Sequence, residues 1–207
     1  MGYVPTYTDD GEGFKVMKWY TSDYHWNHAN IIKYSQRPFA DTVVMDEWLV
    51  LNTNKCVMPN DTLYFLGDWL FPRGQDFNTL ARHYRDRINC RNIVFIWGNH
   101  DNKGKAGNAL PTIFNGCHDI LEVEDSGQTI ILCHYAIRAW DKQYHGSWHL
   151  YGHSHGELPD DPKALSMDVG VDAAAKYLDT ELKPENYRPL RMGDIQEIFS
   201  KNKENYK

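Results

Sequence analysis

One stretch of the sequence constrains the fold more than any other, namely residues 92–101, NIVFIWGNHD. Its first half is mostly β-branched or aromatic, which predicts a strand that is covered on both faces. A plain turn after such a strand would need only Gly98 and Asn99. The additional pair His100-Asp101 indicates that polar side chains are held at the end of a buried strand for more than turning the chain.

Predicted helices and strands alternate in the first half of the chain, which indicates a single α/β domain over residues 1–207. Strands are predicted within residues 14–25, 62–69, 92–97, 129–135, 148–155 and 165–172. Helices are predicted over residues 28–36, 41–54, 77–89 and 194–202. A loose N-terminal arm is expected over residues 1–13 and a frayed tail over residues 201–207.

Two of these helices have start signals in the sequence. The second predicted helix is expected to begin after Asp41, a favourable N-cap, and to carry Val44, Trp48 and Leu51 on one apolar face. The last predicted helix is expected to have Asp194 as its N-cap.

Composition narrows the functional classes. The formal net charge of -6 argues against a broad nucleic-acid-binding face, which is normally basic. The 4 cysteines form no CxxC pair, which predicts a reduced, cytoplasmic chain. No apolar run approaches the length that crosses a membrane, so a soluble protein without a membrane partner is expected.

Polar side chains follow five of the predicted strands, at the point where each strand ends. They are Asp23 and His25, then Asp68, then Asn99, His100 and Asp101, then His134, and finally His153 and His155. Ligands of α/β sheets bind outside the carboxyl ends of the strands, so these side chains are expected to meet at one rim. Asp23 and His25 are two positions apart, as are His153 and His155, so each pair should point to one side of an extended segment.

Adjacent residues at this rim are expected to serve different functions. Adjacent residues of an extended segment point apart, so Asn99 can bind a metal while His100 faces a substrate. Gly98 and Gly152 each precede a candidate ligand, where the backbone must turn or approach another segment closely.

Seven of these side chains are candidate metal ligands: Asp23, His25, Asp68, Asn99, His134, His153 and His155. Seven ligands are too many for one tetrahedral zinc ion with an open position. If Asp68 bridges two ions, each ion receives four protein bonds. Oxygen and imidazole donors without thiolate suit manganese, iron, zinc or nickel. We therefore predict a dinuclear hydrolytic centre with two divalent metal ions, with Mn²⁺ favoured and Fe²⁺/Fe³⁺, Zn²⁺ or Ni²⁺ as alternatives.

These motifs occur in the order found in the calcineurin-like metallophosphoesterases, which the sequence resembles. The blocks are SDYH, GD, GNHD, LCHY and GHSH. The similarity runs from about Trp19 to about Phe199 and is strongest with the short, single-domain phosphoesterases of bacterial and phage type. One departure is Asn27, which stands where many relatives have glycine.

The resemblance implies a four-layer α/β/β/α sandwich of two mixed β-sheets flanked by helices. It also implies two metal sites that share Asp68. The ligands of one would be Asp23, His25 and His155, and those of the other would be Asn99, His134 and His153.

A mechanism for phosphoester hydrolysis follows from this arrangement. Two cations about 3.5–4 Å apart can clamp the attacking and leaving oxygens of an in-line displacement, with a metal-bridging hydroxide as the nucleophile. His100 is predicted to act as the general acid that protonates the leaving alkoxide, and Asp101 is predicted to orient its imidazole.

Several nearby residues allow two interpretations. His28 can contact the substrate phosphate or cap the helix that it precedes. Arg138 can bind a phosphate through two hydrogen bonds, and Trp140 can stack on a base or pack its own loop against the core. Trp148 allows the same two interpretations as Trp140, with packing the favoured assignment, and His145 is either a further contact or a surface residue.

The leading functional prediction is a metal-dependent phosphoric ester hydrolase acting on a small phosphorylated molecule, with nucleotides and cyclic nucleotides as candidates. Diesters and monoesters need the same metals, so both remain candidates. One alternative is a nuclease or RNA-processing esterase of the same fold that acts on a short oligonucleotide. Another alternative is a binding scaffold without catalysis.

Overall fold

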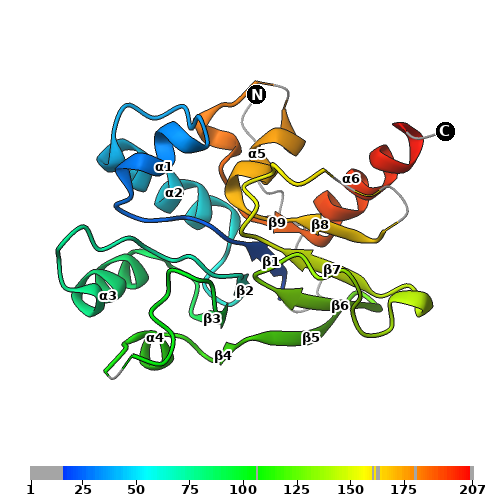
Figure 1. The fold of residues 1–207 in the computed structure, drawn as a ribbon, viewed down its shortest axis with the longest axis horizontal. Coiled ribbons are helices and arrows are strands. Elements are labelled where there is room, and N and C mark those ends of the chain that lie inside the picture. The colour runs from blue at the N-terminus through cyan, green and yellow to red at the C-terminus, as the bar shows by residue number, and fades with distance from the viewer. Residues whose placement is uncertain (1–15, 106, 160, 162–163, 180, 206–207) are drawn as a thin grey trace, which may run out of the picture.

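Two β-sheets lie at the centre of the molecule in the computed structural model, which describes residues 16–105, 107–159, 161, 164–179 and 181–205. The predicted arm, residues 1–13, lies outside the described residues. The first sheet has the strand order β4-β3-β2-β1-β9, and the second has the order β5-β6-β7-β8 (Figure 1).

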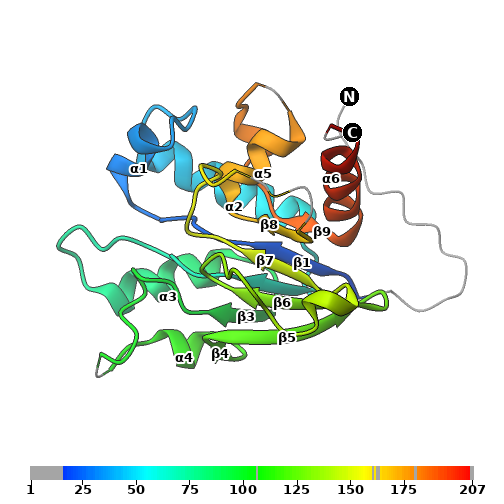
Figure 2. The same cartoon turned by 45° about the vertical axis from the view of Figure 1, so that its right-hand side comes forward.

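The first sheet is parallel except at one edge. Its strands are β1 (Lys18–Thr21), β2 (Thr62–Phe65), β3 (Asn92–Ile96), β4 (Cys117–His118) and the antiparallel β9 (Leu190–Arg191). The second sheet consists of β5 (Ile120–Asp125), β6 (Gln128–Cys133), β7 (Trp148–Tyr151) and β8 (Ser166–Asp168). Only the β5–β6 pair of this sheet is antiparallel among the described strands. The predicted pair of mixed sheets flanked by helices is thus confirmed (Figure 2).

Six α-helices and two 3₁₀ turns lie in the described part of the chain. The helices are α1 (Ala29–Tyr34), α2 (Thr42–Cys56), α3 (Phe77–Arg87), α4 (Leu110–Ile113), α5 (Val171–Leu178) and α6 (Met192–Asn205). The turns are η1 (Gln143–His145) and η2 (Pro184–Asn186). None of the described helices combines the length and the apolar character needed to cross a membrane.

Two apolar clusters fill the interior. One joins Phe65 and Phe95 of the first sheet to Leu49 of α2 and Leu80 of α3, so it lies under the helices. The other joins residues of both sheets with residues of α6, among them Tyr64, Ile96, Ile130, Leu150 and Phe199. Alternate residues of β2 and β3 therefore serve different clusters, as the two-residue period of a strand requires.

The structure corrects three sequence-based expectations. The predicted strand over residues 165–172 ends at Asp168, and Val171 already belongs to α5. Helix α6 begins at Met192, so Asp194 is not its N-cap but lies in its first turn and accepts a 3.0 Å hydrogen bond from the N–H of Arg191. Strand β5 and the short elements α4, β4 and β9 were not predicted.

Helix α2 begins after Asp41 as predicted, because the Asp41 carboxylate accepts a 2.9 Å hydrogen bond from the N–H of Val44. The predicted apolar face is wrong, however, since Val44 is 38% and Leu51 56% exposed. The helix buries Met45 and Leu49 instead. Apolar residues lie all round this helix, so periodicity alone could not select the face that packs.

This burial predicts unequal costs for two leucine substitutions in the same helix. Leu49→Ala removes a fully buried side chain and should lower the free energy of unfolding by about 2–5 kcal/mol. Leu51→Ala is the matched control and should change the free energy of unfolding by less than about 0.5 kcal/mol, because its side chain is 56% exposed. Urea denaturation followed by circular dichroism measures both, and equal losses would contradict the observed packing.

Candidate metal centre

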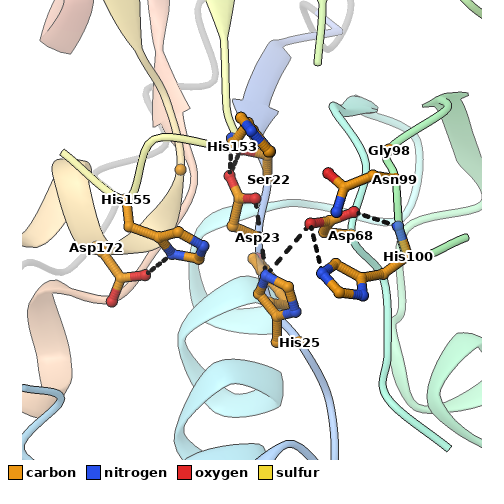
Figure 3. A network of polar contacts seen from close by, with 12 residues as sticks. Ser22, Asp23, His25, Asp68, Gly98, Asn99, His100, His153, His155 and Asp172 are labelled. Atoms are coloured by element: carbon orange, nitrogen blue, oxygen red, sulfur yellow. Dashed lines mark hydrogen bonds and ion pairs between the residues drawn. The ribbon is translucent and has the colours of Figure 1, made fainter. Parts of the chain in front are cut away.

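The segments that follow β1 and β2 continue side by side beyond the carboxyl edge of the first sheet. The N–H of Asp23 donates to the carbonyl of Gly67 at 3.0 Å, and the N–H of His25 donates to the carbonyl of Asp68 at 3.1 Å. The hydrogen bonding of the sheet thus extends past its strands. It brings the side chains of Asp23, His25 and Asp68 to one place (Figure 3).

Five of the seven predicted ligands have a backbone conformation in the left-handed region, which non-glycine residues rarely adopt. The φ angles are 59° at Asp23, 50° at His25, 58° at Asp68, 68° at His153 and 51° at His155. The expectation that these residues lie on extended segments is therefore wrong, although their side chains converge. Such strain persists only where surrounding contacts hold it, and it gathers at binding and catalytic sites.

One group of possible metal ligands consists of Asp23, His25 and His155, which offer ligand atoms within 4.8 Å of one another. Asp23 is 0% and His25 2% exposed. The Oδ1 atom of Asp23 and both ring nitrogens of His25 are buried and have no hydrogen-bond partner among the described residues. Because unpaired buried polar atoms are costly, these atoms fit a cation-binding role.

A second group consists of Asp68, His134 and His153. Nδ1 of His134 lies 2.7 Å from the carbonyl oxygen of Leu66, and its Nε2 lies 3.1 Å from Oδ1 of Asn99. A carbonyl can only accept, so Nδ1 carries the proton and Nε2 keeps its lone pair, as a metal ligand must. Two acceptor atoms then face each other, an arrangement that a cation would stabilise.

Asp68 belongs to the second group and also lies beside the first. Its Oδ2 atom is 3.4 Å from Nε2 of His25, 3.6 Å from Nε2 of His134 and 4.0 Å from Nε2 of His100. Its Oδ1 atom accepts a 3.0 Å hydrogen bond from the backbone N–H of His100. A single carboxylate therefore neighbours imidazoles of both groups, which is the position that a bridging ligand needs.

Burial sets the protonation of these side chains. It lowers the pKa of His25 well below its usual range, with Arg37 and neighbouring histidines adding to the effect. Burial also lowers the pKa of His134. Both rings are neutral at neutral pH, which is the form that binds metal. Burial raises the pKa of Asp23, a shift that a bound cation would reverse.

The donor set matches divalent metal ions. The two groups supply carboxylate oxygens and imidazole nitrogens, with no thiolate. Carboxylate and imidazole together suit first-row divalent ions rather than copper(I). The described residues therefore fit the class of cofactor that the sequence predicted.

Two glycines allow the close approaches on which the groups depend, as the sequence predicted. A Cβ atom at Gly152 would lie 2.5 Å from Oδ2 of Asp23. A Cβ atom at Gly98 would lie 2.6 Å from the backbone nitrogen of Asp68 and 2.9 Å from Oδ2 of Asp101. All three distances are too short for a real side chain, so only glycine fits at these positions.

Asp101 has a different role from the predicted one. Its carboxylate is fully buried and accepts hydrogen bonds from three backbone N–H groups, those of Asp68 at 2.8 Å, Trp69 at 2.9 Å and Gly98 at 2.7 Å. These contacts fasten the loop after β2 to the loop after β3. They do not include the imidazole of His100, so any orienting effect of Asp101 on that ring would have to act through the backbone of the loop.

His100 and His28 both lie beside the two groups. The His100 side chain is 39% exposed, and its ring centroid lies 5.3 Å from that of His25. His28 occupies the N-cap position of α1 but makes no side-chain capping hydrogen bond. Its ring stacks on Phe71 at 4.4 Å, and burial, together with His100 and Arg37, lowers its pKa to about 4. His28 is therefore neutral at neutral pH.

The loop between β6 and β7 adopts one of the two arrangements that the sequence left open for Trp140. The indole N–H of Trp140 donates to Ser147, and its ring lies 5.4 Å from that of His149. These contacts pack the loop against the second sheet, the alternative that the sequence left open. Trp148 is buried against Phe199 as assigned.

Arg138 and His145 are exposed, and within the described part of the chain neither forms a hydrogen bond or ion pair with a candidate ligand. The aromatic residue at the rim is instead Tyr135, which was not singled out from the sequence. It is 45% exposed, and its ring lies 4.9 Å from the rings of His134 and His153. Its place directly after His134 in the LCHY block was the available signal.

Two further residues behind the first group were also missed. Asp172 accepts a 2.7 Å hydrogen bond from Nδ1 of His155 (Figure 3). It also forms a buried ion pair with Arg37. Burial alone would raise the pKa of Asp172, but Arg37 and the hydrogen bond from His155 outweigh it and lower that pKa. Asp172 stands in a GVD segment, whereas Arg37 has no local signal because its partner lies 135 residues away.

No protein-family model matches the sequence. The chain is 31% identical over 189 residues to the uncharacterized protein MJ1445 of Methanocaldococcus jannaschii, and the match covers 88% of this chain and 90% of that protein. The chain belongs to the family of this archaeal protein. The ordered motifs of the chain resemble those of the calcineurin-like metallophosphoesterases.

Two solved structures are similar to that of this chain. The protein of unknown function AQ665 from Aquifex aeolicus has a TM-score of 0.61 and 20% identity, and the match covers 89% of this chain and all of that one. This likeness establishes the shared fold. A structure described as a novel archaeal phosphodiesterase matches with a TM-score of 0.45 and 17% identity, over 75% of this chain and 84% of that one.

The hydrogen bonds of Asp101 predict that a substitution at this position lowers the free energy of unfolding, whereas a substitution at His100 should not. Asp101→Asn replaces one acceptor oxygen by a donor group that faces backbone N–H groups, so the free energy of unfolding should fall by about 1–3 kcal/mol. His100→Asn, at an exposed neighbouring position, should change it by less than about 0.5 kcal/mol. Urea denaturation of the metal-stripped proteins makes the comparison, and an Asp101→Asn variant as stable as the parent would refute the fastening role.

Proposed function

We propose that the protein is a metal-dependent hydrolase of phosphoric esters that uses two divalent ions. The observation that carries this proposal is the position of Asp68, whose Oδ2 lies within 4.0 Å of imidazole nitrogens from His25, His134 and His100. One buried carboxylate flanked by both ligand groups, next to an exposed histidine, suits hydrolysis better than metal storage, which needs no free imidazole at its opening.

Asp68 is the shared ligand in this proposal. The remaining ligands of one ion are Asp23, His25 and His155, and those of the other are Asn99, His134 and His153. Such ions supply positive charge for the phosphoryl oxygens and lower the pKa of bound water. Oxygen and imidazole donors suit manganese, iron, zinc and nickel, and of these Mn²⁺ is the ion proposed.

His100 is the proposed general acid. Its backbone N–H is held by Oδ1 of Asp68, which places the side chain at the edge of the centre, where it is 39% exposed. From there Nε2 can reach an oxygen of an ester bound over Asp68 and give it a proton. Because Asp101 is occupied with backbone N–H groups, His100 carries out this transfer without a carboxylate partner from its own motif.

The proposed substrate is a small phosphorylated molecule, with a nucleotide or a cyclic nucleotide as the leading class. Tyr135 supports this class, because its partly exposed ring beside His134 and His153 offers a face on which a base can stack. Tyr135 thus takes the base-stacking role for which the sequence had offered Trp140. His28 remains a proposed phosphate contact as a neutral hydrogen-bond donor, and Arg138, being exposed on the same loop as Tyr135, remains a proposed contact for the distal part of the substrate.

Metal content is the first property that the proposal predicts. Protein stripped with a chelator should lose hydrolytic activity and regain it with Mn²⁺, and elemental analysis should find two ions per chain. Asp68→Asn removes the charge that both ions share, so it should bind fewer ions than the parent. A variant that retains two tightly bound ions would contradict the bridging role.

His100→Asn separates catalysis from metal binding. It should keep both ions yet lower the turnover number by roughly 10²–10⁴-fold, because a positioned general acid contributes about that factor. Hydrolysis of an aryl phosphodiester and of its monoester analogue by Mn²⁺-loaded protein provides the measurement. Cyclic nucleotides and a short oligonucleotide follow as substrates. Full activity of the variant would remove the proposed role, and absence of hydrolysis in a parent that binds two ions would favour a binding scaffold.

A further inference from the structure

A buried ion pair lies behind one of the two ligand groups. The guanidinium of Arg37 donates to both carboxylate oxygens of Asp172, from Nε to Oδ1 at 2.8 Å and from Nη2 to Oδ2 at 2.7 Å. The two side chains are 0% and 2% exposed. Such a pair contributes little net stability in many proteins, because removing two charges from water costs about as much as their attraction returns. Its place in the fold therefore calls for a functional explanation.

Asp172 controls the orientation of His155. Its Oδ2 atom lies 2.7 Å from Nδ1 of His155 while the same carboxylate receives both arms of Arg37. A carboxylate paired with an arginine is an acceptor, so the proton of the imidazole lies on Nδ1. The Nε2 atom is left with its lone pair, on the ring that lies 5.2 Å from the ring of His25.

Arg37 controls the backbone that carries a second ligand of the same group. Its Nη2 donates to the carbonyl of Asp23 at 2.7 Å, and its Nη1 donates to the carbonyl of Tyr24 at 2.9 Å. Asp23 has a φ angle of 59°, a strained conformation that requires external support. The two hydrogen bonds supply that support directly at the strained residue and its neighbour.

The second ligand group has a separate support. Nδ1 of His134 is oriented by the carbonyl of Leu66, and the loops after β2 and β3 are fastened by Asp101. No hydrogen bond or ion pair of the described residues joins Arg37 or Asp172 to Asn99, His134 or His153. The Arg37–Asp172 pair therefore acts on one group alone.

We infer that Arg37 and Asp172 are positioning residues for one of the two metal ions, the one held by Asp23, His25 and His155. They fix the tautomer and direction of His155 and the backbone of Asp23, and so make this group a tight site while the other group is independent of them. The inference rests on the proposed two-ion centre. It goes beyond that centre because it predicts that the two ions can be uncoupled by residues that bind neither.

The test is Mn²⁺ binding to metal-stripped protein, measured by isothermal titration calorimetry and by elemental analysis after dialysis. Asp172→Asn should weaken the binding of one of the two ions by about 10–100-fold, because that is the usual effect of removing a partner that orients a metal-binding histidine. The binding of the other ion should not change. His155→Ala should weaken the binding of one ion in the same way. Asp61→Asn is the matched control, because its carboxylate is equally buried but accepts from Met17, Trp19 and Met58 at the opposite edge of the sheet.

A double variant removes the ambiguity of misfolding. Asp172→Asn leaves Arg37 as a buried charge with a weakened partner, which destabilises the fold for reasons unrelated to metal. In Arg37→Met/Asp172→Leu no buried charge is left unpaired, so its unfolding midpoint should lie closer to that of the parent than the midpoint of Asp172→Asn does. The weakened binding of one ion should persist in the double variant, because His155 is still released.

Three outcomes overturn the inference. If the binding of both ions weakens equally in the double variant, the pair supports the fold in general and not one site. If parent and variants bind two ions alike, the pair has no positioning role and the two-ion centre still stands. If the parent binds no divalent ion, the proposed function fails together with this inference, and the parent measurement alone reveals it.

Discussion

The arrangement of the candidate metal centre depends on the hydrogen bonds that the fully buried carboxylate of Asp101 accepts. By accepting from the N–H groups of Asp68, Trp69 and Gly98, it fastens the ends of two neighbouring parallel strands to each other. Asp68 and the segment with Asn99 and His100 are placed by this contact. Burial together with the nearby Asp68 raises the pKa of Asp101 to about 7, and the three donated hydrogen bonds oppose that rise. The carboxylate thus holds an unfavourable position because the backbone surrounds it with donors.

Strained backbone is the second feature of the centre. Left-handed conformations cost about 1–3 kcal/mol each for residues other than glycine, and five predicted ligands adopt them. Aspartate and histidine are among the residue types that tolerate this region best. The cost is offset locally, by Arg37 at Asp23, by Asp101 at Asp68, and by Asp168, which accepts from Ser154 and Gly156 on either side of His155. The strained positions are thus supported by residues that are not themselves candidate ligands.

Local patterns in the sequence predicted the strand ends and the polar residues beyond them, because a short motif and a buried strand are both local signals. The face of α2 was not predictable, since apolar residues surround that helix and only the tertiary packing selects Leu49 over Leu51. A short apolar run is ambiguous between strand and helix, which is why α5 was taken for part of a strand. Arg37 was not identifiable because its meaning comes from Asp172, a residue distant in sequence and adjacent only in the fold.

The two ligand groups differ in their access to solvent, and this difference orders their proposed roles. In the first group Asp23 and His25 are buried and His155 is partly exposed, whereas in the second group Asn99 and His153 are exposed and His134 is buried. In the proposed function a substrate would therefore meet Asn99 and His153 first, on the side where the proposed acid His100 and the ring of Tyr135 also lie. The first group, supported from behind by the Arg37–Asp172 pair, would be suited to hold its ion through repeated turnovers. The asymmetry of exposure and support on the two sides of Asp68 thus fits the proposal of one retained ion and one substrate-facing ion.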